Sequence, residues 1–377
     1  MRRRFQMPVT VRGKIPGIAS VPKNLVFAGE RFLLELGKAT WRPDRLDDPG
    51  RLFGLLKYAG AISAKSSHLK LKSEMTDLDT HKKKVLSDEF GCGMAFVFAQ
   101  RVLKARRILD LETAVRRGWV TTRAGKRERP DFIGQLQGGG LLVLEAKGTQ
   151  CGHAYSWSQV QKGCGQVRRV KLPTGSRRVL QARVAVGVSI GFDGSSTHTA
   201  LHVQDPEEDN ALDYSFDGDP DETLVRGHYL RVAALVGDLG VAAQLEGRDR
   251  QVGDLQDVPH RLIGRREYVG SEVVVQHGRS ELGFFVGLAA DVREDLLHGN
   301  WQRLASRQDE GNEEIFEFSD DQVDDARLRH VLSGSESPGR RRWELGQGDE
   351  DDHSDPDGET FAQSPDGTAW LTWSRQS

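Results

Sequence analysis

One short stretch of this chain, from Arg129 to Thr149, restricts the fold more than any other. It reads RPDFIGQLQGGGLLVLEAKGT, with three consecutive glycines between two apolar runs. Because glycine adopts positive φ at little cost, the triplet predicts a turn between strands at 131–137 and 141–147. The continuous apolar run that opens the second strand is typical of a strand buried on both faces. The sequence therefore predicts a β-hairpin within the sheet of an α/β protein.

The same hairpin carries charged residues where its buried strands end. Glu145 and Lys147 are two residues apart and so point to the same face, and Asp131 can lie beside them on the partner strand. Buried charges are costly unless they are paired or bind a metal, and two carboxylates facing one point suit Mg²⁺ or Mn²⁺. With a lysine that holds or helps deprotonate a water, this arrangement predicts metal-assisted hydrolysis of a phosphodiester. The alternative is that Asp131 caps a strand and Glu145 and Lys147 form an exposed ion pair on an edge strand.

The segments Pro130-Asp131 and Glu145-Ala146-Lys147 resemble the motif of the PD-(D/E)XK nuclease superfamily. The resemblance covers roughly residues 86–205. It implies a restriction-endonuclease-like core, in which helices flank a mixed central sheet. It also implies that Asp131 and Glu145 bind a metal, that the Ala146 carbonyl completes the coordination, and that Lys147 positions the attacking water.

The resemblance also implies an acidic residue on a helix that precedes the hairpin. Apolar residues at helical spacing predict such a helix over 86–103, and Glu89 is the acid that matches best, with Asp88 as its adjacent competitor. Glycines at 91 and 93 weaken the helix but allow a close approach, either of another backbone or of a nucleic acid. Glu89 is therefore expected to join the two hairpin carboxylates as a catalytic and metal-binding residue.

A second helix is expected after the hairpin, over 155–170. Several members of the superfamily carry a glutamine on the helix that follows the Glu-x-Lys strand. Gln159, Gln161 and Gln166 all lie on this segment, and Gln161 is preferred. It is expected to contact nucleic acid.

Charge is divided unevenly between the two halves of the chain. Residues 1–180 hold 35 Lys and Arg against 15 Asp and Glu, a net charge of +20, which leaves 18 and 40, a net of −22, for residues 181–377. A basic half that contains the hairpin is the electrostatic footprint of a nucleic-acid-binding region. The basic residues expected to contact phosphates lie before and after the hairpin: Lys126, Arg127, Arg129, Lys162, Arg168 and Arg169.

Four regions follow from the composition and the predicted elements. Residues 1–85 are predicted to be an accessory region, 86–205 the nuclease core, and 206–305 a second α+β region. Residues 205–222, where the last two of these regions meet, are expected to form a loop or linker. Residues 306–377 are predicted to be an acidic, partly mobile tail that ends in a hairpin turning at 365–367.

Several classes of protein are disfavoured. No apolar run approaches the 18 or more residues of a membrane span, and no apolar segment follows the basic Met1–Arg4 as in a secretory signal. Three cysteines make no disulfide framework, so a cytoplasmic location is expected. Cys151, His153 and Cys164 are too few for a structural zinc site, which normally takes four ligands.

The sequence thus predicts a Mg²⁺-dependent endonuclease, with Mn²⁺ as a substitute, that acts on DNA. Restriction, phage defence and repair are all compatible roles, and RNA is not excluded as the substrate. A homodimer or larger assembly is compatible with the sequence. The rival hypothesis is a nucleic-acid-binding or scaffold protein that keeps the fold without turnover, since fold does not imply function.

Overall fold

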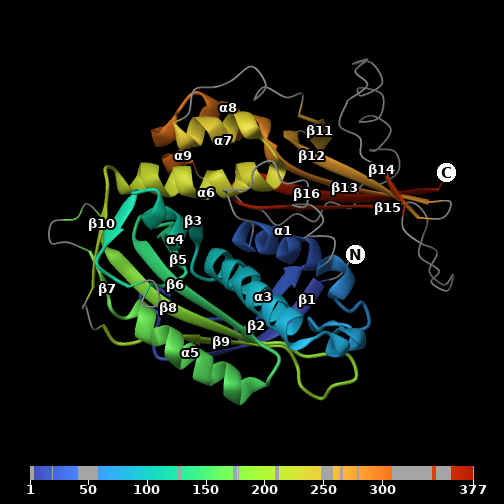
Figure 1. Cartoon of the computed structure of the whole chain (residues 1–377), viewed down its shortest axis with the longest axis horizontal. Helices are drawn as coiled ribbons and strands as arrows, with labels where there is room; N and C mark the ends of the chain where they lie inside the picture. Colours follow the sequence, from blue (N-terminus) through green and yellow to red (C-terminus); the bar gives the residue numbers. More distant parts are fainter. Residues whose placement is uncertain are drawn as a thin grey trace. The chain divides into compact units, whose positions relative to one another are not determined.

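The computed structural model describes residues 4–18, 20–40, 58–125, 129–172, 176, 178–208, 212–247, 258–263, 266–277, 280–307, 342–344 and 358–376 (Figure 1). The described residues up to 231 form one compact unit, and those from 232 onward form a second. The first unit contains the hairpin and the residues predicted to act around it.

A seven-stranded mixed sheet forms the centre of the first unit. Its strands run in the order β2 (Asn24–Ala28), β1 (Arg4–Arg12), β9 (Ala200–Gln204), β8 (Leu180–Ser189), β6 (Leu141–Thr149), β5 (Phe132–Leu136) and β3 (Ala105–Asp110). Strand β6 is parallel to β8 and β1 is parallel to β9, whereas the other neighbouring pairs are antiparallel. The prediction of an α/β protein with a mixed sheet flanked by helices is confirmed.

Alternate residues of β6 enter two separate hydrophobic cores. Leu142 and Leu144 pack on the face covered by α3 (Thr80–Arg101) and, beyond it, α1 (Gly29–Thr40). Leu141 and Val143 pack with α5 (His153–Val167) on the other face. Figure 1 shows α3 and α5 on opposite sides of the sheet. The continuous apolar run of β6 is therefore explained by burial on both faces.

The two strands of the hairpin do not pair along their whole length. Pairing of β5 with β6 stops at Phe132 opposite Leu144, whereas β6 continues beside β8 until Thr149 pairs with Ser189. From Glu145 onward, β6 therefore lies beyond the end of its ladder with β5. The charged residues of the motif occupy this diverging end.

Two strands of the region predicted to be accessory belong to the central sheet. Strand β1 pairs with β9 and β2 pairs with β1, so Arg4–Arg12 and Asn24–Ala28 extend the central sheet. The helix predicted over 86–103 begins earlier, at Thr80, because the Asp79 side chain accepts a hydrogen bond from the Lys82 amide and caps it.

The acidic segment 205–222 is not simply a linker. Strand β10 (Leu212–Phe216) pairs with β4 (Val120–Thr122) and β7 (Val170–Lys171) in a three-stranded sheet. Helix α6 (Pro220–Val236) then begins. The remaining short elements of this unit are η1 (Ser73–Asp77) and α4 (Leu111–Arg116).

The second unit is built on a largely antiparallel sheet. Its strands run β11 (His260–Ile263), β12 (Arg266–His277), β13 (Ser280–Ala289), β16 (Thr368–Gln376) and β15 (Gly358–Gln363), with β14 (Arg342–Glu344) parallel to β12. Its helices include α7 (Leu239–Glu246), α8 (Ala290–Leu297) and α9 (Trp301–Ser306). The predicted terminal hairpin is present as β15 and β16. Most of the acidic segment before it lies outside the described residues.

Candidate active site

Two reciprocal hydrogen bonds link the segments that carry Asp131 and Glu145. The Asp131 backbone N–H donates to Glu145 Oε2 at 2.9 Å, and the Ala146 backbone N–H donates to Asp131 Oδ2 at 2.9 Å. Each carboxylate thus binds the backbone of the other strand just beyond the end of the ladder. The two acids predicted to converge do lie together, and these backbone donors fix their positions.

Glu145 is completely buried, with 0% of its surface exposed. A Cβ placed on Gly163 of α5 would lie 2.9 Å from Glu145 Cγ, so a glycine is needed where the helix crosses this side chain. Burial, followed by the charge of Asp131, raises the pKa of Glu145 to about 8. Burial also raises the pKa of Asp131, although the Lys147 charge opposes the shift. The two desolvated carboxylates lie side by side, and too little positive charge surrounds them to favour ionisation of both.

Lys147 supplies the nearest cation. Its Nζ donates to Glu145 Oε1, and its side chain is 29% exposed. Burial disfavours the ammonium, but the charges of Glu145 and Asp131 outweigh it and raise the pKa of Lys147. The alternative of an exposed pair on an edge strand is wrong, because Glu145 is buried and β6 lies between β5 and β8.

Helix α3 brings a further acid to this end of the hairpin. Ser87 and Gly91 contact β6 so closely that a Cβ on Gly91 would lie 2.6 Å from the Gly148 amide nitrogen. The glycine at 91 therefore serves close packing of helix on strand. Successive helix residues are about 100° apart, so Asp88 flanks this contact whereas Glu89 lies about 200° around from Ser87. The charge of Lys147 acts on the Asp88 carboxylate, whose pKa is raised by burial. The geometry favours Asp88 over the expected Glu89.

The glutamines of α5 are placed differently from the expectation. Gln161 is exposed on the outer face of the helix. Gln159 and Gln166 lie one turn on either side of Gly163, which packs on Glu145. Gln166 Nε2 donates to the Arg129 carbonyl at 2.8 Å. These two glutamines, rather than Gln161, lie toward the carboxylates.

The basic residues predicted to contact nucleic acid have mixed outcomes. Lys162 and Arg168 are exposed and Arg169 is half-buried. Arg129 is held in place by a salt bridge to Glu112 at 2.9 Å. Lys126 and Arg127 lie outside the described residues.

Sequence reasoning missed an ion pair between a buried arginine and a half-buried aspartate beside the hairpin. Arg231 of α6 lies 3.1 Å from Asp110 Oδ2, and its guanidinium is 5.2 Å from the centre of the Phe132 ring. The Leu111 N–H donates to the Asp131 carbonyl at 3.0 Å, so this pair adjoins the start of β5. Arg231 lies 121 residues along the chain from Asp110, and no local pattern could have linked them.

The carboxylates of the site match the needs of a hard cation only in part. Within the described ranges, no group of three or more His, Cys, Asp and Glu side chains is arranged to hold a metal. The carboxylates of Asp131 and Glu145 are nevertheless oxygen donors of the kind that Mg²⁺ prefers. A divalent cation beside them would favour the ionised carboxylates that burial disfavours, and it would offset the charge of Asp131 that further raises the pKa of Glu145. Asp131 and Glu145 therefore fit the implied metal.

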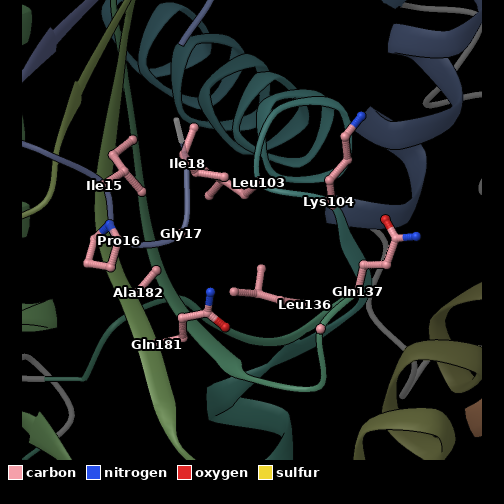
Figure 2. A pocket seen from close by; sticks show the side chains of 11 residues that line it. Ile15, Pro16, Gly17, Ile18, Leu103, Lys104, Leu136, Gln137, Gln181 and Ala182 are labelled. Atoms are coloured by element: carbon pink, nitrogen blue, oxygen red, sulfur yellow. The ribbon is translucent and has the colours of Figure 1, made fainter. Parts of the chain in front are cut away.

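A cavity of about 320 Å³ lies at the other end of the hairpin, beside the glycine turn. Figure 2 shows its apolar wall and the Gln181 amide at its edge. The wall includes Ile15, Ile18, Leu103, Leu136 and Ala182. Because Leu136 and Asp131 are at opposite ends of β5, this cavity is separate from the charged cluster.

Of the helices in the described part of the chain, none has both the length and the apolar character required to cross a bilayer. Comparison with known proteins finds no matching family model, no similar curated protein and no similar solved structure. The geometry described above is therefore the basis for any functional conclusion.

Proposed function

We propose that this chain is a metal-dependent nuclease with a restriction-endonuclease-like core. The observation that carries the proposal is the pair of buried carboxylates, Asp131 and Glu145, bound to each other's strand beside Lys147. An uncompensated acid pair next to a lysine is suited to a divalent cation and to an anionic substrate.

The order of elements supports the same proposal. Helix α3 precedes β3, the hairpin of β5 and β6 follows, and α5 then leads to β8 beside β6. The resemblance implies these parts: a helix with an acid, a hairpin with the motif at its end, and a helix with glutamines after it. Asp88 is the helix acid favoured by the geometry.

Each residue at the diverging end of the hairpin has a distinct role in the proposal. Asp131 and Glu145 would hold Mg²⁺ together with the Ala146 carbonyl. When bound, the cation would polarise the scissile phosphate and stabilise the charge that develops in phosphodiester hydrolysis. Lys147 orients the attacking water through its ammonium, which Glu145 holds in position. The Asp131 backbone N–H and the Ala146 N–H keep the two carboxylates aligned before substrate arrives.

DNA is the proposed substrate, since the resemblance is to a superfamily that acts mostly on DNA. The net charge of +20 in residues 1–180 supports an anionic polymer as partner. RNA remains the second candidate, and restriction or phage defence is the proposed biological setting. A non-catalytic binding protein is the rival from another class.

Incubation with supercoiled plasmid, linear duplex and RNA, each with Mg²⁺, Mn²⁺ or EDTA, tests the proposal. Cleavage that requires a divalent cation and disappears in EDTA is the expected result. Glu145→Gln is the matched variant, because it keeps the shape of the buried side chain and removes its charge. Salt-sensitive binding without cleavage under any of these conditions would favour the binding protein instead.

A further inference from the structure

Helix α5 presents two flanks, one on each side of the residues that pack on the sheet. Ser156, Val160 and Gly163 face the sheet. At about 100° per residue, His153 and Trp157 fall on the flank toward β9 and β1. Both rings contact His202 of β9, at centroid distances of 5.3 and 4.9 Å.

The opposite flank faces the hairpin. Helical spacing places Tyr155, Gln159, Lys162 and Gln166 in one row along it. The hydrogen bond from Gln166 Nε2 to the Arg129 carbonyl fixes the direction of this row, because Arg129 leads directly into Asp131. The row therefore runs alongside the hairpin that carries Asp131 and Glu145.

The side chains of this row have the chemistry of a ligand-binding surface. Tyr155 is 48% exposed, one of the largest exposed hydrophobic side chains in the described part of the chain. Gln159 Nε2 is buried and has no hydrogen-bond partner among the described residues. A buried polar group without a partner is rare and calls for an explanation. Lys162 is exposed and adds a cation about 10 Å from Tyr155 along the helix, at 1.5 Å per residue.

We propose that this flank of α5 is a subsite for an unpaired nucleobase next to the cleaved strand. The Tyr155 ring stacks on the base, Gln159 donates a hydrogen bond to the bound nucleotide, and Lys162 contacts a backbone phosphate. Bases in a duplex are already stacked and paired, so a stacking residue of this kind selects single strands, frayed ends or flaps. The inference rests on the nuclease proposal and names the substrate class of that site.

Binding of fluorescent oligonucleotides in EDTA tests the subsite without any need for cleavage. A labelled single strand and the matching duplex are titrated with wild type, Tyr155→Ala and Tyr155→Phe, with fluorescence anisotropy as the readout. Because stacking contributes about 1–3 kcal/mol per base, Tyr155→Ala should weaken single-strand binding by about 5- to 150-fold. Tyr155→Phe should retain the affinity, and duplex binding should change less than about twofold.

Two glutamines of the same helix give a matched control. Gln159→Ala should weaken single-strand binding several-fold, whereas Gln161→Ala, on the outer face, should leave it unchanged. Melting curves check that each variant is folded, and Tyr155→Ser replaces Tyr155→Ala if the latter is not. Three outcomes would each overturn the subsite. The first is an equal loss of affinity for single strand and duplex, and the second is no loss in either alanine variant at 155 or 159. The third is that the wild type does not bind single strands. Absence of cleavage together with the expected binding pattern would overturn the nuclease proposal and leave the subsite standing.

Discussion

Glu35 and Glu145 are both buried carboxylates with 0% exposure in the same unit, yet their surroundings differ. Glu35 lies 2.7 Å from Lys38 Nζ and 3.1 Å from Arg31 Nη2, and it accepts a hydrogen bond from Gln100 at 2.9 Å. Among the described residues, Lys147 is the cation that pairs with Glu145, which also lies beside a second carboxylate.

The difference separates a carboxylate whose charge is fully compensated from one whose charge is not. Around Glu35, two cations and an amide satisfy one carboxylate, so nothing further is needed. Around Glu145, burial and the neighbouring Asp131 leave a deficit of positive charge, and the pKa of Glu145 rises to about 8. Burial of an acid alone therefore does not mark a site, whereas an acid pair with too little positive charge does.

The largest expected effect is on cleavage. Lys147→Ala should reduce the rate by about 10⁴-fold, equivalent to about 5–6 kcal/mol, because the attacking water loses the group that orients it. Single-strand and duplex affinities should be nearly unchanged, since one charge among many contributes little. Plasmid nicking beside a gel-shift control measures both. Equal cleavage by the variant and wild type would place the active site elsewhere.

Glu35→Ala should lower the free energy of unfolding by about 3–5 kcal/mol, because it leaves Arg31 and Lys38 buried without their carboxylate. Glu145→Gln should cost far less at pH 8, since it removes a repulsive charge. Urea denaturation of both variants measures the difference. If Glu145→Gln were less stable than Glu35→Ala, the distinction drawn between the two carboxylates would be wrong.

Stability should depend on pH with a sign set by Glu145. Its folded pKa is about 8, above the unfolded value of 4.5, so the folded state holds a proton that the unfolded state has lost. Without metal, stability should therefore fall by on the order of a few kcal/mol as pH rises from about 5 to 8. Added Mg²⁺ should raise the Tm more at pH 8 than at pH 6 because it favours the ionised pair. Thermal melts of wild type and Glu145→Gln test this, and an equally steep pH dependence in the variant would contradict it.

The smallest effect should come from exposed charges. Replacing Lys162 and Arg168 by Gln should flatten the log–log salt dependence of single-strand binding by about 0.7 for each phosphate that these side chains neutralise in the wild type. The thermal stability should hardly change, since both side chains are exposed. Gel shifts at several salt concentrations measure the slope. An unchanged slope would remove these two residues from the path of the nucleic acid.

Local patterns are enough to find the hairpin and its charges. Glycines 138–140 and the run from Leu141 place both strands, and the two-residue period places Glu145 beside Lys147. Helix α5 is also predicted to within a few residues. These features depend on residues close together in the chain, whose spacing carries the information.

The parts that could not be predicted depend on distant partners. The place of β1 in the sheet depends on its pairing with β9, almost 200 residues later. The role of Arg231 likewise depends on its ion pair with Asp110. The choice between Asp88 and Glu89 needs the rotation of α3 on β6, which Gly91 and Gly148 set by their close packing. The choice among the glutamines of α5 could not be made from the sequence for the same reason, since only packing shows which flank of α5 faces the hairpin.

The pairing of β1 with β9 has a consequence for how the chain folds. Val9 lies opposite Leu201, so the Val9–Arg12 end of one edge of the first strand has no partner until residues 200–204 have left the ribosome. Such long-range pairing slows folding, because a large loop must close before the two strands can pair. The hairpin, whose strands are joined by a short turn, can form early and locally. Completion of the sheet is thus a late event, and β1 must avoid aggregation while most of the first unit is synthesised.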